Sequence, residues 1–141
     1  MKIALIQRKA VPNDVKANLD LAVGCMEEAG RAGADLVLFP EMWSIGYAPP
    51  FPEAFDDPFQ KERENERKAW LSQAVGEDSA YIRTLRETAK RLSVGAVITC
   101  LYEGEKGSQN EALLIGREGE ILLRYKSFWI RLWKSRLYGN R

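Results

Sequence analysis

The stretch Ala34–Tyr47 reads A-D-L-V-L-F-P-E-M-W-S-I-G-Y, and the organisation of the chain is best understood from it. Its apolar run, Leu36–Phe39, is typical of a strand that is buried on both faces of a sheet. Pro40 ends the strand, because proline has no N–H to donate to a neighbouring strand. Glu41 therefore lies just past the carboxyl end of a buried strand, where open α/β sheets bind their ligands. A carboxylate that is desolvated there can serve as a general base.

Length and composition indicate one globular domain. The chain has 141 residues, of which 45% are hydrophobic and 29% charged, and no apolar run reaches the length of a membrane span. The N-terminus enters a strand pattern directly, without a signal-peptide layout, so we expect a cytoplasmic protein. Two cysteines are too few for a disulfide scaffold, and the lack of histidine excludes Ser-His-Asp and Cys-His catalysis and most zinc sites. We expect neither a cofactor nor a metal.

Two strand–helix units surround the quoted stretch. Residues 2–7 have a strand pattern, and apolar residues at helical spacing predict an amphipathic helix over 14–31. After a long loop, Asp78-Ser79 predict the start of a second helix, and Val94–Leu101 predict a second buried strand. The apolar face of the second helix consists of Tyr81, Ile82, Leu85, Ala89 and Leu92. A strand–helix–strand order favours parallel pairing through a right-handed crossover.

The remaining segments are predicted to be a loop, an exposed helix and a hairpin. Residues 46–60 combine prolines with aromatic residues and predict a loop, which either shapes a pocket beside Glu41 or packs on the body of the protein. Opposite charges at helical spacing over Lys61–Ala69 predict an exposed helix without a chemical role. Arg117-Glu118-Gly119 predict a tight turn between two antiparallel strands.

Four features together resemble the carbon–nitrogen hydrolases of the nitrilase superfamily. They are F-P-E-M-W-x-x-G-Y at 39–47, N-L at 18–19, Asn110 at the start of a strand, and G-E-I-L-L-R-Y-K at 119–126. The resemblance covers residues 2–126. It implies an α/β fold that forms the N-terminal half of a nitrilase-like α-β-β-α sandwich, with a mixed sheet in which two strand–helix units are followed by a hairpin.

The resemblance also implies a Glu–Lys–Cys triad that hydrolyses the C–N bond of a small amide, nitrile or N-carbamoyl compound. Glu41 matches the general base of the triad, and Lys126 matches the lysine that stabilises the oxyanion of the tetrahedral intermediate. The cysteine would attack the substrate carbon and form a thioester. Without the resemblance, the simpler interpretation of Glu41 is a residue that caps the next turn or forms an ion pair with a lysine or arginine. The simpler interpretation of Lys126 is a surface lysine at the end of a strand.

The nucleophile of that triad has no match in this sequence. The family's cysteine follows the lysine, whereas Cys25 and Cys100 both precede Lys126, in a helix and a strand that match non-catalytic elements. We therefore interpret residues 1–126 as a truncated hydrolase domain without triad turnover of its own. Half a sandwich leaves one sheet face apolar and uncovered, so we expect a homo-oligomer formed through the sandwich.

Residues 127–141 differ from what the family places after its lysine. Residues 121–141 contain six basic and no acidic side chains, and so abrupt a change in composition is what a shifted reading frame would give. The alternative is a non-catalytic binding module, because Trp129, Leu132, Trp133 and Leu137 share one helical face that could contact a membrane surface or a partner protein. Aromatic residues among arginines are weak support for nucleic-acid binding, and we expect no nucleic-acid partner.

Overall fold

The computed structural model describes residues 1–57, 60–105 and 107–126. The amphipathic face proposed for residues 127–141 lies outside the described residues. The strands are β1 (Ile3–Leu5), β2 (Leu36–Leu38), β3 (Gly95–Gly104), β4 (Gly107–Ile115) and β5 (Ile121–Lys126). The α-helices are α1 (Val15–Arg31), α2 (Glu64–Leu71) and α3 (Ala80–Leu92), with short 3-10 helices at Trp43–Ile45, Pro52–Phe55 and Lys61–Arg63. In the described residues, no helix is both long enough and apolar enough to span a bilayer.

The five strands form one mixed sheet in the order β1-β2-β3-β4-β5. The pairs β1–β2 and β2–β3 are parallel, whereas β3–β4 and β4–β5 are antiparallel. This arrangement confirms the predicted mixed sheet of two strand–helix units followed by a hairpin. The first strand is shorter than the predicted span of residues 2–7, because its pairing with β2 extends over three residues.

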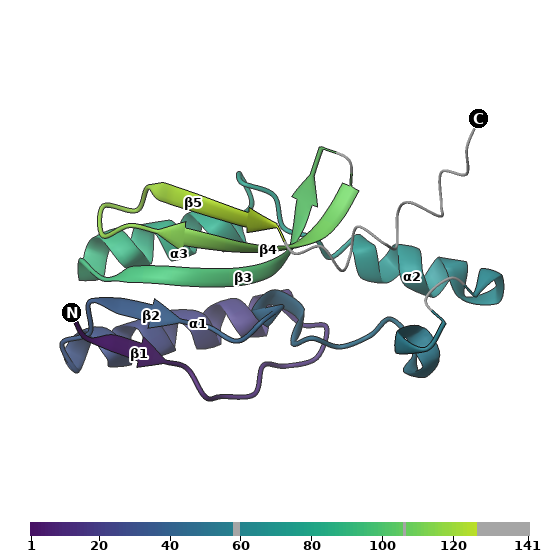
Figure 1. Ribbon diagram of the computed structural model, residues 1–141, viewed down its shortest axis with the longest axis horizontal. Helices are drawn as coiled ribbons and strands as arrows, with labels where there is room; N and C mark the ends of the chain where they lie inside the picture. Colours follow the sequence, from purple (N-terminus) through teal and green to yellow (C-terminus); the bar gives the residue numbers. More distant parts are fainter. Residues whose placement is uncertain (58–59, 106, 127–141) are drawn as a thin grey trace.

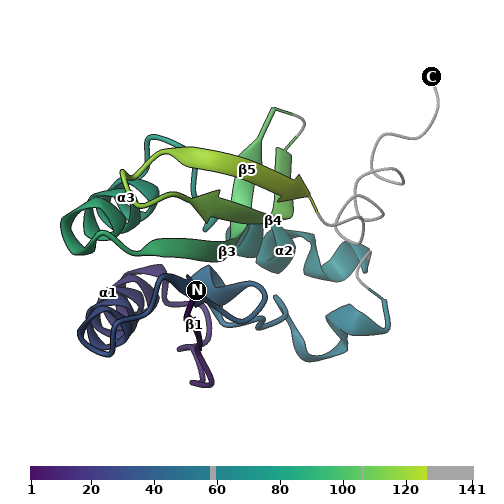
Figure 2. The ribbon, with the colours of Figure 1, turned by 60° about the vertical axis from the view of Figure 1, so that its left-hand side comes forward.

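Helices α1 and α3 lie side by side on one face of the sheet (Figures 1 and 2). Each begins at a residue that the sequence marks as a cap. Asp14 Oδ1 accepts a hydrogen bond of 2.9 Å from the backbone N–H of Ala17, and Ser79 Oγ accepts one of 3.2 Å from that of Ile82. The predicted apolar face of α3 is confirmed, since Tyr81, Ile82, Leu85 and Ala89 are all buried. Against these helices pack the inward-facing strand residues Val37, Ala96, Ile98, Leu113 and Ile115.

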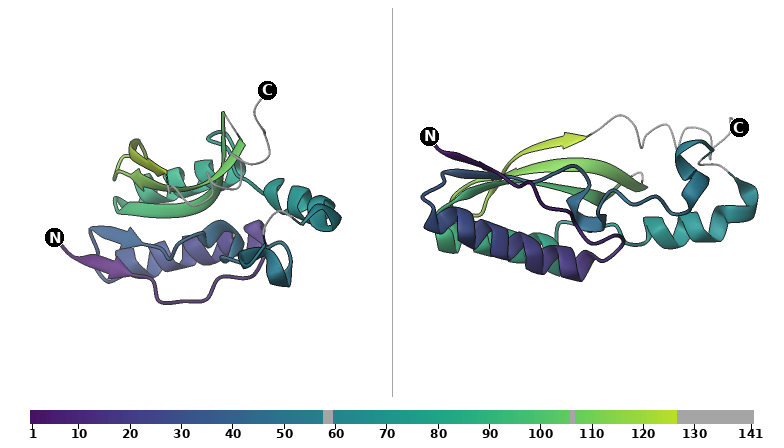
Figure 3. Two further views of the ribbon diagram at one scale, coloured as in Figure 1. Left: turned by 45° about the vertical axis from the view of Figure 1, so that its right-hand side comes forward. Right: turned by 90° about the horizontal axis from the view of Figure 1, so that it is seen from below.

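The opposite face of the sheet has little cover. Among the described residues, no helix lies in front of the strands in the view of Figure 1, and Figure 3 shows α1 and α3 together on the other side. Leu5 on β1 and Leu123 on β5 are 63% and 60% exposed. At the carboxyl end of β3 this face is covered, because Leu101 packs with Met42, Ile45 and Trp70. The expected uncovered apolar face is therefore present, except where the Met42–Ile45 turn and α2 lie over it.

The segment between Gly46 and Leu71 differs from its prediction in one respect. The charged run forms a 3-10 helix and then α2, as expected of a helix, but it is not wholly exposed. Arg67 and Trp70 are buried, and the indole N–H of Trp70 donates to the carbonyl of Ala48 at 2.7 Å. The charged residues of α2 other than Arg67 therefore lie on its outer side, while Trp70 attaches the helix to the loop that follows Glu41.

Candidate active site

Glu41 follows β2 directly and receives a hydrogen bond from a distant strand. The Nδ2 amide of Asn110, on β4, donates to Glu41 Oε1 across 69 positions of sequence. Asn110 is only 6% exposed, so its amide is held firmly by the sheet. Glu41 itself is exposed, which corrects the expectation of a desolvated carboxylate. The reason is the open sheet face beside it, where no further layer of the described protein excludes water.

The backbone next to Glu41 is strained. Met42 has φ 54° and ψ 34°, in the left-handed region that residues with a Cβ rarely adopt, and its side chain is buried. Tyr47, at the other end of the same turn, has φ 52°. Conformations of this kind cost about 1–3 kcal/mol each and persist where the surroundings fix them, often at functional sites. The turn from Glu41 to Tyr47 is therefore a segment whose shape is imposed by its neighbours.

Two side chains connect this turn to β3, Thr99 from the strand and Ser44 from the turn. The hydroxyl of Thr99 donates to the carbonyl of Pro40 and accepts from the backbone N–H of Trp43 at 3.3 Å. Ser44 Oγ accepts from the backbone N–H of Leu101 at 3.0 Å. Glu41 lies between these attachment points in the sequence, so the contacts with β3 fix the position of its backbone.

Helix α1 supplies the third attachment through a completely buried amide. Asn18 Nδ2 donates to the carbonyls of Val11 and Ser44 at 2.8 and 3.1 Å, and its Oδ1 accepts from the N–H of Val11 at 2.7 Å. The indole N–H of Trp43 in turn donates to the backbone carbonyl of Asn18 at 2.9 Å. The N-L pair at 18–19 thus has a physical role, because Asn18 joins the first loop and the turn after Glu41 to α1.

Lys126 lies elsewhere in the structure. Its ammonium is 3.7 Å from Oε1 of Glu111, the residue directly opposite it on β4. Glu111 and Asn110 are neighbours on one strand, so their side chains point to opposite faces of the sheet. The structure therefore brings Glu41 together with Asn110 and Lys126 together with Glu111, and it does not bring Glu41 and Lys126 into contact.

Glu111 is a buried acid that the sequence analysis did not single out. It is 1% exposed, its Oε1 accepts from Nε2 of Gln109, and its Oε2 has no hydrogen-bond partner among the described residues. The Lys126 side chain opposite it is 62% exposed. A buried carboxylate needs a nearby cation, and Lys126 provides one, although at a distance longer than a direct hydrogen bond.

Comparisons of the sequence and the structure with known proteins identify the family of this chain. Residues 2–139 match the sequence profile described as carbon-nitrogen hydrolase. The chain belongs to the carbon–nitrogen hydrolase family. It is 31% identical over 132 residues to Nitrilase 2 from an unknown prokaryotic organism, covering 88% of this chain and 39% of that protein. Over 47 residues, 33% of this chain and 12% of the relative, it is 43% identical to an aliphatic nitrilase from Rhodococcus rhodochrous.

Solved structures of an amidase from Nesterenkonia sp. share the fold of this chain. One of them has 28% sequence identity and a TM-score of 0.63, and the match covers 90% of this chain and 42% of that one. A variant of that amidase with a replaced glutamate shows covalent addition of the acetamide moiety of fluoroacetamide at its active-site cysteine. The present chain thus spans about two fifths of the length of the relatives that it matches over most of its own length.

Neither Cys25 nor Cys100 is placed to act as such a nucleophile. Cys25 on α1 is 2% exposed and Cys100 on β3 is fully buried. Burial raises the pKa of the Cys25 thiol, and it raises the pKa of the Cys100 thiol strongly, with a further increase from the nearby Glu111 carboxylate. Nucleophilic attack requires the thiolate, so both thiols are in the inert form at neutral pH.

This protonation state predicts slow alkylation. At pH 7–8, iodoacetamide should label Cys25 and Cys100 of the native chain more than about tenfold more slowly than the chain unfolded in guanidinium chloride. Intact mass spectrometry over time measures both rates. Rapid native labelling at Cys100, identified by its loss in Cys100→Ala, would contradict the inert assignment.

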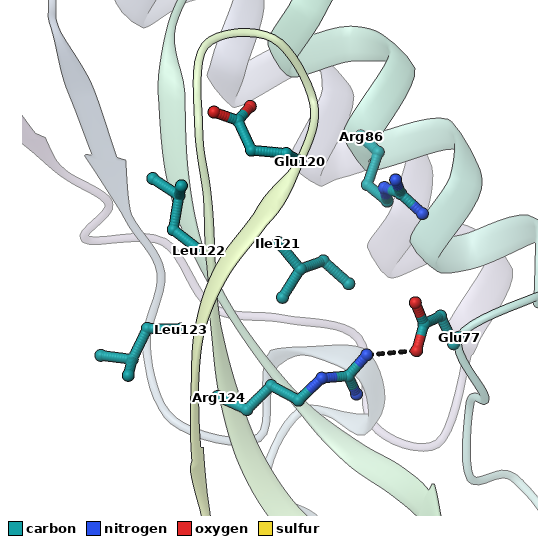
Figure 4. A pocket seen from close by; sticks show the side chains of 7 residues that line it. All are labelled: Glu77, Arg86, Glu120, Ile121, Leu122, Leu123 and Arg124. Atoms are coloured by element: carbon teal, nitrogen blue, oxygen red, sulfur yellow. Dashed lines mark hydrogen bonds and ion pairs between the residues drawn. The ribbon is translucent and has the colours of Figure 1, made fainter.

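A cavity of about 460 Å³ opens between β5 and α3, away from Glu41 (Figure 4). Its charged side chains already have partners. Arg124 pairs with Glu77 and donates to the Tyr102 hydroxyl at 2.7 Å, and Nε of Arg86 donates to the carbonyl of Gly119 at 2.7 Å. In the described part of the chain, no group of three or more acidic or cysteine side chains is arranged to hold a metal ion. We assign no chemistry to this cavity.

Proposed function

We propose that this chain supplies the general base of a carbon–nitrogen hydrolase that acts on a small amide, nitrile or N-carbamoyl compound, with Glu41 as that base. The observation that carries the proposal is the hydrogen bond from the buried amide of Asn110 to Glu41 Oε1. It orients a carboxylate at the carboxyl end of a parallel strand, where such sheets bind ligands. The hydrogen bonds from Thr99 and Asn18 hold the backbone of the turn that carries Glu41, and the left-handed backbone of Met42 belongs to the same turn.

In the proposed reaction, Glu41 takes the proton of an attacking thiol, the sulfur bonds to the substrate carbon, and Lys126 stabilises the negative charge on the substrate oxygen or nitrogen. To reach that position Lys126 would have to leave Glu111 and turn toward the face of the sheet that carries Asn110; it is the last residue of the edge strand β5, and its side chain is 62% exposed. Since Cys25 and Cys100 are inert, we propose that neither is the nucleophile and that residues 1–141 alone show no triad turnover. A second copy of the chain is the proposed protein partner.

The experiment that tests this proposal is a chimera in which residues 1–126 replace the matching N-terminal part of the Nesterenkonia amidase. That amidase has been solved in complex with butyramide, which is therefore the substrate to use. We expect ammonia release from butyramide, and a loss of about 10²–10⁴-fold in kcat/KM for Glu41→Gln, because general-base catalysis contributes this much. Lys126→Met should also lower kcat/KM.

Glu62→Gln is the matched control, since it makes the same chemical change at an exposed helix position. Its kcat/KM should equal that of the unmodified chimera, and circular dichroism should show that all the chimeras are folded. Full activity in Glu41→Gln would rule out the assigned base. Amidase activity of the 141-residue chain that survives replacement of Glu41 and Lys126, or that requires Cys100, would overturn the whole proposal.

The alternative function, a binding module that uses the basic tail, depends on residues outside those that the structure describes. No feature of residues 1–57, 60–105 or 107–126 favours it over the hydrolase assignment.

A further inference from the structure

Strand β5 contains one residue more than its pairing with β4 requires. Leu123 is paired with Leu114, and the next pair joins Ile121 to Ile115. Leu122 lies between them without a position of its own on β4, which makes it the extra residue of a β-bulge. Successive residues of a regular strand point to opposite faces, whereas the side chains of Leu122 and Leu123 leave β5 on the same side in Figure 4. The bulge thus sets the face of every β5 residue that follows it.

The bulge decides on which face of the sheet Lys126 lies. In the observed pairing, the bulged register, Lys126 is opposite Glu111 on the face covered by α1 and α3. If Leu122 were paired in an unbroken ladder, each later residue would move by one position along β4, and Lys126 would lie opposite Asn110. We call this second pairing the regular register. A shift of one residue exchanges the faces of a strand, so Lys126 would then share a face with Asn110, whose amide donates to Glu41.

The sequence of β5 fits the regular register better than the bulged one. Apolar or aromatic residues at 121, 123 and 125 alternate with Arg124 and Lys126. Such alternation is typical of a strand with one buried face. The regular register would place Leu123 opposite the buried Leu113 on the helix-covered face, and both cations on the other face. The bulged register instead places both cations on the helix-covered face.

Ion pairs hold the two cations in the bulged register. Arg124 pairs with Glu77 and donates to the Tyr102 hydroxyl at 2.7 Å, and Lys126 lies 3.7 Å from Oε1 of Glu111. The pair between Arg124 and Glu77 is partly exposed, and such pairs contribute little to stability. The contact of Lys126 is longer than a direct hydrogen bond. The bulged register is therefore held by contacts of modest strength, against the alternation in the sequence.

The regular register also supplies a hydrogen-bond donor where the bulged register lacks one. Oε2 of the buried Glu111 has no hydrogen-bond partner among the described residues. A shift by one residue would put Tyr125 opposite Glu111 in place of Lys126. The phenol O–H of Tyr125 would then lie on the side of the sheet where this oxygen is unpartnered.

From the bulge, the alternation and the unpartnered oxygen we infer that β5 exchanges between the bulged register and the regular register. In the described chain β5 pairs with β4 alone, and the turn before Ile121 need not change, so the exchange breaks hydrogen bonds to one strand only. In the regular register Lys126 lies beside Asn110 and faces the side of Glu41. The catalytic meaning of this register rests on the proposed function, whereas the register itself does not.

Disulfide trapping in the full 141-residue chain tests the inference, because a disulfide can join residues that are directly opposite on neighbouring strands. Ala112→Cys combined with Tyr125→Cys reports the bulged register, in which these two positions are paired. Ala112→Cys combined with Arg124→Cys reports the regular register, since Arg124 is opposite Leu113 in the bulged one. Under mild oxidation we expect both pairs to form disulfides, the second more slowly, as measured by mass spectrometry of the peptides.

Deletion of Leu122 is the matched control. It removes the extra residue, so the bulged partners stay opposite each other in an unbroken ladder, and the shift would then require a change in the turn as well. The deletion should slow disulfide formation between positions 112 and 124 by about tenfold or more, and leave that between 112 and 125 unchanged. Both chains in the first comparison lack Arg124, so the loss of its ion pair cannot produce the difference.

Circular dichroism verifies that the variants are folded. If Arg124→Cys prevents folding, Asn110→Cys combined with Lys126→Cys reports the same regular register. The inference would be overturned by the absence of a disulfide in the pair that reports the regular register, or by equal rates for that pair with and without Leu122. No step of the experiment measures turnover, so its outcome is independent of the proposed catalytic assignment.

Discussion

Replacement of Trp43 by alanine is expected to lower the free energy of unfolding by about 3–5 kcal/mol, the usual range for removing a buried aromatic side chain. Trp43 is 1% exposed and packs against Phe39, with ring centroids 5.1 Å apart. Its indole N–H also donates to the backbone carbonyl of Asn18 at 2.9 Å. The substitution therefore removes both a core contact and the link between the turn after Glu41 and α1. Urea denaturation at low micromolar concentration, followed by circular dichroism, measures the loss.

Trp43→Phe separates the two contributions. It keeps an aromatic ring but lacks the N–H donor, so the loss should be smaller than that of the alanine variant. Leu122→Ala, at a side chain that is 59% exposed, should stay within about 0.5 kcal/mol of the unmodified chain. If Trp43→Ala changed the midpoint no more than Leu122→Ala, Trp43 would not be a core residue in solution.

Asn18→Ala should be the second large effect, with a loss of about 2–4 kcal/mol in the free energy of unfolding. Asn18 is completely buried and makes three hydrogen bonds, two to Val11 and one to Ser44. Removing it leaves the buried carbonyl of Ser44 and the partly buried N–H and carbonyl of Val11 without this partner, at about 1–3 kcal/mol for each group that water cannot reach. Asn18→Asp should be at least as damaging, because it removes both donors and buries a charge.

Asn65→Ala provides the matched control for Asn18→Ala. It makes the same change at an exposed position of α2, where alanine is the better helix former. Its free energy of unfolding should be unchanged or slightly higher. Equal midpoints for Asn18→Ala and Asn65→Ala in urea would show that the Asn18 bonds contribute nothing to stability.

The sequence predicts the mixed sheet and its two covering helices because each depends on local patterns. Asp14 and Ser79 are recognisable caps, and the apolar face of α3 repeats at helical spacing. The position of Glu41 after a buried strand is predictable for the same reason, since Pro40 ends the run. In these places, local propensity and tertiary packing favour the same structure.

The contacts of the site could not be predicted in the same way. Asn110 meets Glu41 through strand register between segments 69 positions apart, and register is not visible in either segment alone. Glu111 is charged, which predicts exposure, yet it lies beneath β4 because its neighbour Asn110 faces Glu41. The burial of Arg67 and Trp70 could not be predicted either, because the surrounding residues of α2 are mostly charged and indicate an exposed helix.

Each strand of this sheet pairs only with strands that adjoin it in the sequence. The strands can therefore join the sheet in the order of their synthesis, although β2 is paired with β3 only after the long segment that contains α2 and α3 has been made. The stage at which β3 has joined β2 but β4 has not yet been made is the most exposed one. At that moment the ten residues of β3 present an unpaired edge, and a second nascent chain on the same messenger could pair with it. Because β4 begins three residues after β3 ends, we expect this exposed stage to be short.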